Sequence, residues 1–232
     1  MADGKVKGYT ETSPPDDASV NTKCSEVHRV GITTQESIEY YSKWAENGIY
    51  DQDLCQERYQ GPVIVANVLA EHFKDKITGA KILDVAAGTG SVGKELQDRG
   101  FKHLDALEPA AGMLEQARKK NIYTNFCSEI LDSKRLSIED DKYDCCVISG
   151  GMGEGQIPCH GLYELIRVTK SGGLICIVMR EEYLTSVKEY HNRLEPLMKK
   201  LEEDGTLKQL SRVVVPRYSF DNNGVVYKLL VC

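Results

Sequence analysis

Three glycines and one acidic residue carry the clearest chemical pattern in the sequence. Gly88, Gly90 and Gly93 fit the spacing G-x-G-x-x-G, and Glu108 follows Gly88 by twenty residues. In a turn between a strand and a helix, such glycines let a ligand approach the backbone. The N-terminus of the helix then faces an anion, and the acidic residue accepts hydrogen bonds from ribose hydroxyls. The pattern predicts a site for a ligand that contains a ribose, such as a nicotinamide dinucleotide or S-adenosylmethionine.

A second acidic residue separates these two ligands. Asp84 lies inside the apolar segment before the turn, four residues ahead of the first glycine. Burying a carboxylate is costly unless it is hydrogen-bonded or faces a cation. S-adenosylmethionine carries a sulfonium and an ammonium group, whereas a dinucleotide site more naturally has an apolar residue at this position. Asp84 therefore favours S-adenosylmethionine.

The elements around the turn follow an alternating pattern. Short apolar segments, typical of buried strands, are separated by segments with the apolar spacing of amphipathic helices, such as Ala110, Met113, Leu114 and Ala117. This alternation predicts a parallel sheet with helices on both faces. The expected strands are residues 81–86, 103–108, 122–127, 143–149 and 174–179.

The last quarter of the chain has a different pattern. Apolar residues between 187 and 201 predict one long helix, kinked or restarted near Pro196 because proline lacks an amide donor. Two strand-like segments follow, at 207–218 and 225–232, with Asn223 and Gly224 between them. Asn-Gly between such segments predicts a hairpin, so we expect the sheet to end in an antiparallel pair.

Composition limits the classes of function. The chain has 232 residues and a formal net charge of −6, which argues against nucleic acid as a partner. Its eight cysteines show neither a CxxC pair nor metal-ligand spacing, so we expect free thiols, no metal site and a reducing compartment. The sequence has no apolar stretch typical of a signal peptide or a membrane span. We therefore expect the protein in the cytoplasm, or in both the cytoplasm and the nucleus.

Four motifs in order resemble those of class I S-adenosylmethionine-dependent methyltransferases. Residues 82–90 resemble the first motif, with Ala86 where the family usually has glycine. Residues 107–109, followed by Met113 and Leu114, are similar to the second motif, and residues 143–149 and 169–173 to the fourth strand and the next turn. The resemblance implies S-adenosyl-L-methionine as cofactor. It also implies a Rossmann-like α/β fold, with a seven-stranded mostly parallel sheet, an antiparallel C-terminal hairpin and a helical N-terminal cap.

The resemblance also implies a division of the chain. Residues 1–32, rich in Gly, Pro, Asp, Thr and Ser, are expected to be a flexible tail. The methyltransferase domain would then span residues 33–232, with a helical cap at 33–78 and the Rossmann-like core at 79–232.

Cofactor-binding roles follow from the same resemblance. Glu108 would accept both ribose hydroxyls, the glycine turn would meet the methionine portion, and residues after the second and third strands would lie near the adenine. The end of the fourth strand is where cofactor and acceptor should meet. Aromatic residues of the cap would either close over the sulfonium by cation–π attraction or pack in the core. The candidates are Tyr41, Trp44, Tyr50, Asp84, Ala86, Gly88, Thr89, Gly90, Glu108, Pro109, Met113, Ser128, Glu129, Ser149, Gly150 and Gly151.

The reaction expected is methyl transfer to a small-molecule or protein acceptor. Because this is an in-line displacement, positioning can supply most of the catalysis, and a base is needed only if the acceptor loses a proton. The possible bases from position alone are Glu154, His160 and His191, but all three are more simply interpreted as solvated surface residues. No catalytic residue is assigned. A nicotinamide-dependent oxidoreductase and a non-catalytic S-adenosylmethionine-binding regulator stay as alternatives. The acceptor and the oligomeric state stay open.

Overall fold

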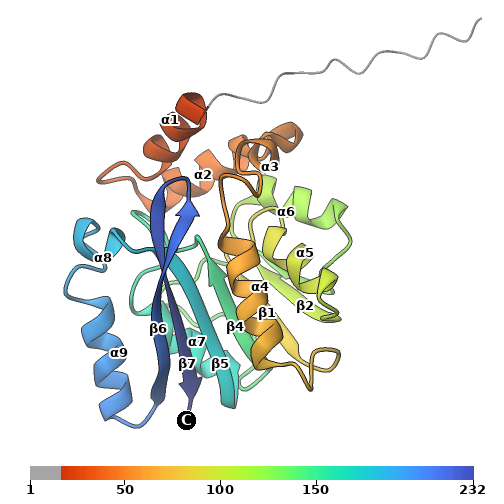
Figure 1. Ribbon diagram of the computed structural model, residues 1–232, viewed down its shortest axis with the longest axis vertical. Helices are drawn as coiled ribbons and strands as arrows, with labels where there is room; N and C mark the ends of the chain where they lie inside the picture. The colour runs from red at the N-terminus through yellow and green to blue at the C-terminus, as the bar shows by residue number, and fades with distance from the viewer. Residues whose placement is uncertain (1–16) are drawn as a thin grey trace, which may run out of the picture.

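Seven strands form one sheet, and helices cover both of its faces (Figure 1). The computed structural model describes residues 17–232, and in them the strand order is β3-β2-β1-β4-β5-β7-β6. The first five strands are parallel, and β7 runs antiparallel to both β5 and β6, which confirms the expected fold. The strands are β1 (Lys81–Val85), β2 (His103–Leu107), β3 (Asn125–Cys127), β4 (Tyr143–Ser149), β5 (Thr169–Arg180), β6 (Leu207–Ser219) and β7 (Asn222–Val231).

The order of the strands reverses direction at β1. Strands β2 and β3 lie on one side of β1, while β4 and β5 lie on the other. In doubly wound sheets, the crevice at the carboxyl ends of strands beside such a point is where ligands bind. Val85 pairs with Leu107 of β2 and with Ile148 of β4, so the residues that follow β1, β2 and β4 come together at one edge.

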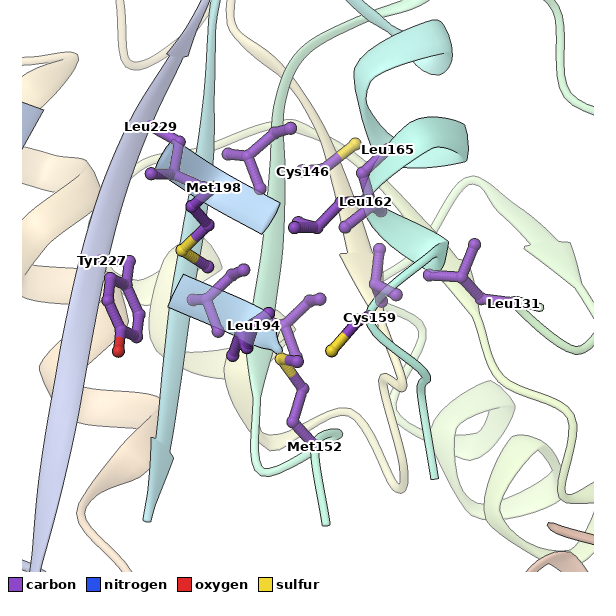
Figure 2. Close-up of a cluster of buried hydrophobic side chains, with 14 of the residues drawn as sticks. Leu131, Cys146, Met152, Cys159, Leu162, Leu165, Leu194, Met198, Tyr227 and Leu229 are labelled. Carbon is purple, nitrogen blue, oxygen red and sulfur yellow. The ribbon is translucent and has the colours of Figure 1, made fainter. Parts of the chain in front are cut away.

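Apolar stripes attach the helices to the sheet. On one face lie α4 (Gly61–His72), α5 (Ser91–Asp98) and α6 (Ala111–Lys119), which bury side chains such as Leu69 and Leu96. On the other face lie α7 (Gly161–Val168) and α9 (Leu194–Glu203). Figure 2 shows Leu194 and Met198 of α9 near Tyr227 and Leu229 of β7, and Leu162 and Leu165 of α7 near Cys146 of β4. These two layers of helices fix the position of the sheet, and with it the edge where β1, β2 and β4 end.

The helix expected from residue 187 does not form in one piece. A short helix α8 (Tyr183–Ser186) is followed by turns, and α9 begins only at Leu194. Pro196 lies in the first turn of α9, where an amide donor is not needed within the helix. The helix therefore restarts near Pro196, which was one of the two expected forms, and no single kinked helix runs from residue 187 to residue 201.

The hairpin at the sheet edge turns earlier than expected. Phe220 and Asp221 connect β6 to β7, while Asn223 and Gly224 already belong to β7. Gly224 pairs with Arg180, and a Cβ there would lie 2.7 Å from the Cβ of Tyr218. This glycine serves close packing rather than the turn. The third strand is also shorter than expected, since β3 begins only at Asn125.

The expectation of a tail to residue 32 is wrong from Asp17 onward. Residues Asp17–Val27 form helix α1, which buries Val20, Cys24 and Val27 against Trp44. The apolar side chains recur at helical spacing, which gives α1 a face that packs on the cap. Residues 1–16, the rest of the expected tail, lie outside the described residues. The cap continues with α2 (Thr34–Trp44), the short 3-10 helix η1 (Glu46–Gly48) and α3 (Ile49–Asp53).

All eight cysteines are free thiols. Between residues 17 and 232, we find no group of three or more His, Cys, Asp or Glu side chains that could hold a metal ion. None of the helices described is both long and apolar enough to span a membrane.

Candidate functional site

The turn after β1 has three residues in the left-handed conformation that favours glycine. These are Ala86, with φ of 54°, Gly88, with φ of 56°, and Gly90, with φ of 91°. Gly90 is the N-cap of α5, which begins at the next residue, Ser91. Ala86 occupies the position where the resemblance predicted glycine, and its small side chain is the least that an L-residue can place there.

Gly90 and Gly93 of the G-x-G-x-x-G pattern leave room for the ring of Tyr123. A Cβ on Gly93 would overlap the ring and hydroxyl of Tyr123, and one on Gly90 would lie 3.1 Å from the same ring. The Tyr123 hydroxyl donates a hydrogen bond to Asp84, which is buried beneath the turn. Burial raises the pKa of Asp84 to about 7. One carboxylate oxygen of Asp84 is therefore held by Tyr123, whereas Oδ1 is buried without a hydrogen-bond partner among the described residues.

Glu108 follows β2 and is held by two backbone amides. Its Oε2 accepts from the amide of Gly88 at 2.9 Å, and its Oε1 accepts from the amide of Ala110 at 2.7 Å. Glu108 is 6% exposed, and burial raises the pKa of its carboxyl group to about 7. A carboxylate has about four acceptor positions, so each oxygen keeps one for a ligand.

A cavity of about 480 Å³ opens at this edge of the sheet. The loops after β1, β2 and β4 form its walls together with α2 and the loop after β3. Eleven of the sixteen predicted residues line it. They are Tyr41, Tyr50, Ala86, Gly88, Glu108, Pro109, Met113, Glu129, Ser149, Gly150 and Gly151.

The remaining five predicted residues lie elsewhere. Asp84 and Gly90 lie against Tyr123, as described above. The Thr89 hydroxyl donates to Asp51, and Ser128 lines a separate hollow over β3. Trp44 does not line the large cavity, and its Nε1 donates to Asp53 at 2.6 Å. The structure does not bring these side chains to the cavity wall.

A second, smaller cavity of about 50 Å³ adjoins the first. The two cavities share Tyr41, Tyr50 and Gly150 as wall residues. Tyr59 lines the small cavity, and its hydroxyl lies 2.8 Å from the Ser149 hydroxyl. The small cavity therefore meets the large one at the end of β4.

Polar side chains connect the walls of the two cavities. The Gln156 amide donates to the hydroxyl of Tyr41, which lies 3.4 Å from Nε2 of His28. The Nδ1 atom of His28 lies 2.7 Å from the carbonyl oxygen of Cys24, which fixes Nδ1 as the donor. Burial lowers the pKa of His28 to about 4, so its ring is neutral near pH 7.

The three possible bases named from the sequence do not gather at one place. His160 lines the large cavity but is exposed. Glu154 accepts from the amide of Gly31, and exposed His191 lies beside Asn192. No catalytic base follows from their positions.

Several wall residues were missed by the sequence analysis. Ser37 and Ile38 come from α2, Tyr59 precedes α4, and His28 lies in the segment expected to be a tail. A signal for α2 was present, because Thr33 and Glu36 form a capping box at its start. No local pattern places Tyr59 or His28 near the glycine turn.

Fold and site together define a class. The strand order, the glycine turn and the buried acidic residue after β2 are those of the class I S-adenosylmethionine-dependent methyltransferases, and the chain belongs to this family. Residues 82–173 match a family model described as a methyltransferase domain. The cofactor is therefore S-adenosyl-L-methionine. The glycine spacing alone had also allowed a nicotinamide cofactor, but this family does not use one.

Individual relatives can be named within the class. Methyltransferase-like protein 27 of Homo sapiens is 34% identical over 170 residues, which are 73% of this chain and 67% of the relative. Demethylmenaquinone methyltransferase of Clavibacter sepedonicus is 37% identical over 102 residues, 44% of this chain and 41% of that enzyme. Magnesium protoporphyrin IX methyltransferase of Synechocystis, solved with bound S-adenosylmethionine, has a TM-score of 0.58 at 12% identity, with 95% of this chain and 100% of that chain covered.

The residues of the large cavity fit the cofactor. Glu108 has one free acceptor position on each oxygen, which suits two neighbouring ribose hydroxyls. Gly88 lies at the wall with only the Met113 sulfur at 4.0 Å from where its Cβ would be. Met113, Pro109 and Ile130 provide apolar surface for a flat ring.

Proposed function

We propose that this protein transfers the methyl group of S-adenosylmethionine to a small-molecule or protein acceptor at the end of β4. The observation that carries the proposal is the Glu108 carboxylate, held by the amides of Gly88 and Ala110 at the wall of a cavity of about 480 Å³. The two cavities that meet at Gly150 support a small acceptor over a large one.

The bound cofactor supplies an electrophilic methyl group on a positively charged sulfur. Glu108 would accept hydrogen bonds from the ribose hydroxyls and so fix the cofactor in one orientation. Tyr41 and Tyr50, from the cap, would exclude water and present aromatic surface to a positive charge. Gly150 and Gly151 line the cavity at the end of β4, where the acceptor would lie. A Cβ on Gly151 would lie 2.6 Å from the Cβ of Ala86, so this glycine lets the loops after β1 and β4 pack closely there. In-line transfer depends on this positioning.

Calorimetric titration tests the cofactor assignment. S-adenosylhomocysteine should bind, and NADH should not. Glu108→Ala should weaken S-adenosylhomocysteine binding by about 1–3 kcal/mol, because two hydrogen bonds to a buried carboxylate are lost. Glu115→Ala is the matched control, since Glu115 is 69% exposed on α6. Equal affinity of the Glu108 variant and the unmodified protein would remove the assignment.

A labelled methyl group tests turnover. Incubation with labelled S-adenosylmethionine and fractionated cell extract should transfer label to an acceptor. Tight cofactor binding without transfer to any fraction would instead favour a non-catalytic regulator.

We also propose that the protein works in the cytoplasm or the nucleus, on an acceptor other than nucleic acid. Its free thiols suit a reducing compartment, and its net charge of −6 disfavours a phosphate backbone. Fractionation of cells that express the tagged chain would test the compartment, and recovery with secreted proteins would contradict it.

A further inference from the structure

Arg180 is the cation of the small cavity. It ends β5, its side chain is 17% exposed, and its guanidinium lies 5.7 Å from the centre of the Tyr183 ring. Its Nη1 donates to Glu182 at 3.2 Å and its Nη2 to the Ser219 hydroxyl at 3.5 Å. A guanidinium has five N–H donors, and a good charge-assisted bond is about 2.7–2.9 Å long. Within residues 17–232, Arg180 therefore keeps donor capacity for another group.

Tyr183 adds an unused hydroxyl to the same cavity. The side chain is 8% exposed, and among the described residues its buried oxygen has no hydrogen-bond partner. A buried hydroxyl without a partner costs free energy, so such groups are rare unless a ligand or water completes them. Tyr183 and Arg180 thus both line the small cavity with hydrogen-bond donors that the described residues do not fully use.

The other walls add no competing negative charge. They are mostly aromatic, and His28 is neutral because burial lowers its pKa to about 4. The carboxylate of Asp53 lies nearby in the cap, where it is already paired with Lys23 at 2.6 Å and bonded by Trp44. The Glu182 side chain is 51% exposed, so solvent screens its charge. An anion in this cavity would face one incompletely paired cation.

The size of the cavity limits that anion. A single water needs about 10–15 Å³ of cavity, so a cavity of about 50 Å³ has room for about three to five non-hydrogen atoms. A carboxylate and the carbon that bears it match this size. The rest of the molecule would extend past Tyr41, Tyr50 and Gly150 into the cavity that holds the cofactor.

We propose that the small cavity is the acceptor subsite, and that it selects small-molecule acceptors with a carboxylate, which Arg180 and Tyr183 bind. This inference rests on the proposed methyltransferase function and narrows its acceptor to one chemical class. The carboxylate anchors the acceptor, and the atom to be methylated lies toward the shared wall at Gly150. Arg180 and Tyr183 are thus specificity residues rather than groups that act on the reacting atoms.

The only tryptophan of the chain offers a direct readout, since Trp44 lines the small cavity. We would titrate the protein, saturated with S-adenosylhomocysteine, with benzoate and with its neutral isostere benzamide at matched ionic strength. Benzoate should change Trp44 fluorescence saturably and bind at least about tenfold more tightly than benzamide, because only benzoate gains charge-assisted hydrogen bonds.

Two variants assign the effect to the cavity. Arg180→Gln should weaken benzoate binding by about tenfold or more. Tyr183→Phe removes only the hydroxyl, and should weaken benzoate binding by about three- to tenfold without lowering stability, because that hydroxyl has no partner to lose. Arg135→Gln is the control for net charge, since Arg135 is 62% exposed on the surface, and it should bind benzoate as the unmodified protein does.

The outcomes separate this inference from the proposed function. If S-adenosylhomocysteine fails to bind, the proposed function fails, whatever benzoate does. If S-adenosylhomocysteine binds but benzoate gives no saturable change, or binds no better than benzamide, the acceptor subsite is wrong. Equal benzoate affinity in Arg180→Gln, in Tyr183→Phe and in the unmodified protein would also overturn it.

Discussion

The hydroxyl of Tyr123 hydrogen-bonds the carboxylate of Asp84 beneath the glycine turn, across 39 positions of the chain. The ring passes over the first turn of α5, where Gly90 and Gly93 leave room for it. Two of the three glycines in the pattern thus serve an internal contact, and only Gly88 lines the cavity. The hydrogen bond offsets part of the cost of burying Asp84.

Tyr123→Phe tests the importance of this bond. The variant keeps the ring in place but leaves a buried carboxyl group without its tyrosine donor, so the free energy of unfolding should fall by about 1–3 kcal/mol. Urea unfolding measures the change. Tyr163→Phe is the control, since Tyr163 is 50% exposed on α7 and should change stability by less than about 0.5 kcal/mol. Equal stability of the two variants would contradict the role given to Tyr123.

Asp84 should also make stability depend on pH. Its folded pKa, raised by burial to about 7, lies above the ordinary value of 3.8. Between these values the folded protein binds a proton that the unfolded chain has released, so this group's contribution to stability falls as pH rises from about 4 to 7. Asp84→Asn has no such titration. Urea unfolding from pH 4.5 to 8 should therefore show that the free energy of unfolding falls less with pH in the variant than in the unmodified protein. An equal fall in both proteins would contradict the titration of Asp84.

The fold is best predicted from the sequence where periodicity is local. Alternating strands and helices predicted the parallel sheet, and the turn after β1 with Glu108 placed the large cavity at the correct edge. The prediction is incomplete where partners are distant in the chain. Asp84 was expected beside the cofactor, and nothing in the spacing reveals Tyr123 as a donor to it. Helix α1 has only three buried residues and a polar composition, so its docking on the cap depends on tertiary contacts that composition does not reveal.

Glu108 should link cofactor binding to proton release. Burial raises its pKa to about 7, and ribose hydroxyls that donate to both oxygens would favour the charged form. Binding then favours loss of the proton, so affinity for S-adenosylhomocysteine should rise about three- to tenfold from pH 6 to pH 8. Calorimetry in two buffers of different ionisation enthalpy measures the released proton. Glu108→Gln should bind with little dependence on pH, and an equally steep profile in that variant would point to another group.

Ala86 and Ala87 should respond in opposite directions to glycine. Ala86 has φ of 54°, so Ala86→Gly relieves backbone strain and should raise stability by up to about 1 kcal/mol. Ala87 is buried and is not among the left-handed residues, so Ala87→Gly loses a packed methyl group and adds chain entropy. It should lower stability by about 1–2 kcal/mol. Thermal unfolding of both variants checks the signs, and a loss of stability in both would show that Ala86 is not strained.

Asp53 should decide whether α1 stays docked on the cap. The carboxylate is 1% exposed and accepts from Trp44 Nε1 and from Lys23 Nζ of α1, each at 2.6 Å. Asp53→Ala removes both bonds and leaves the indole N–H buried without a partner, so stability should fall by about 2–4 kcal/mol. Lys23→Met keeps the tryptophan bond but leaves the buried carboxylate of Asp53 without its cation, so it should also lower stability, by about 1–3 kcal/mol.

Hydrogen exchange separates local opening from global loss of stability in Asp53→Ala. The amides of Asp17–Val27 should exchange faster by a larger factor than those of β4 and β5, because α1 loses its ionic anchor while the sheet keeps its ladder. Cys24 and His28 form one wall of the small cavity, so opening of α1 should also weaken benzoate binding, with S-adenosylhomocysteine affinity less affected. Uniform acceleration across α1 and the sheet would mean that the cap and the sheet unfold together and that Asp53 does not act as a local anchor.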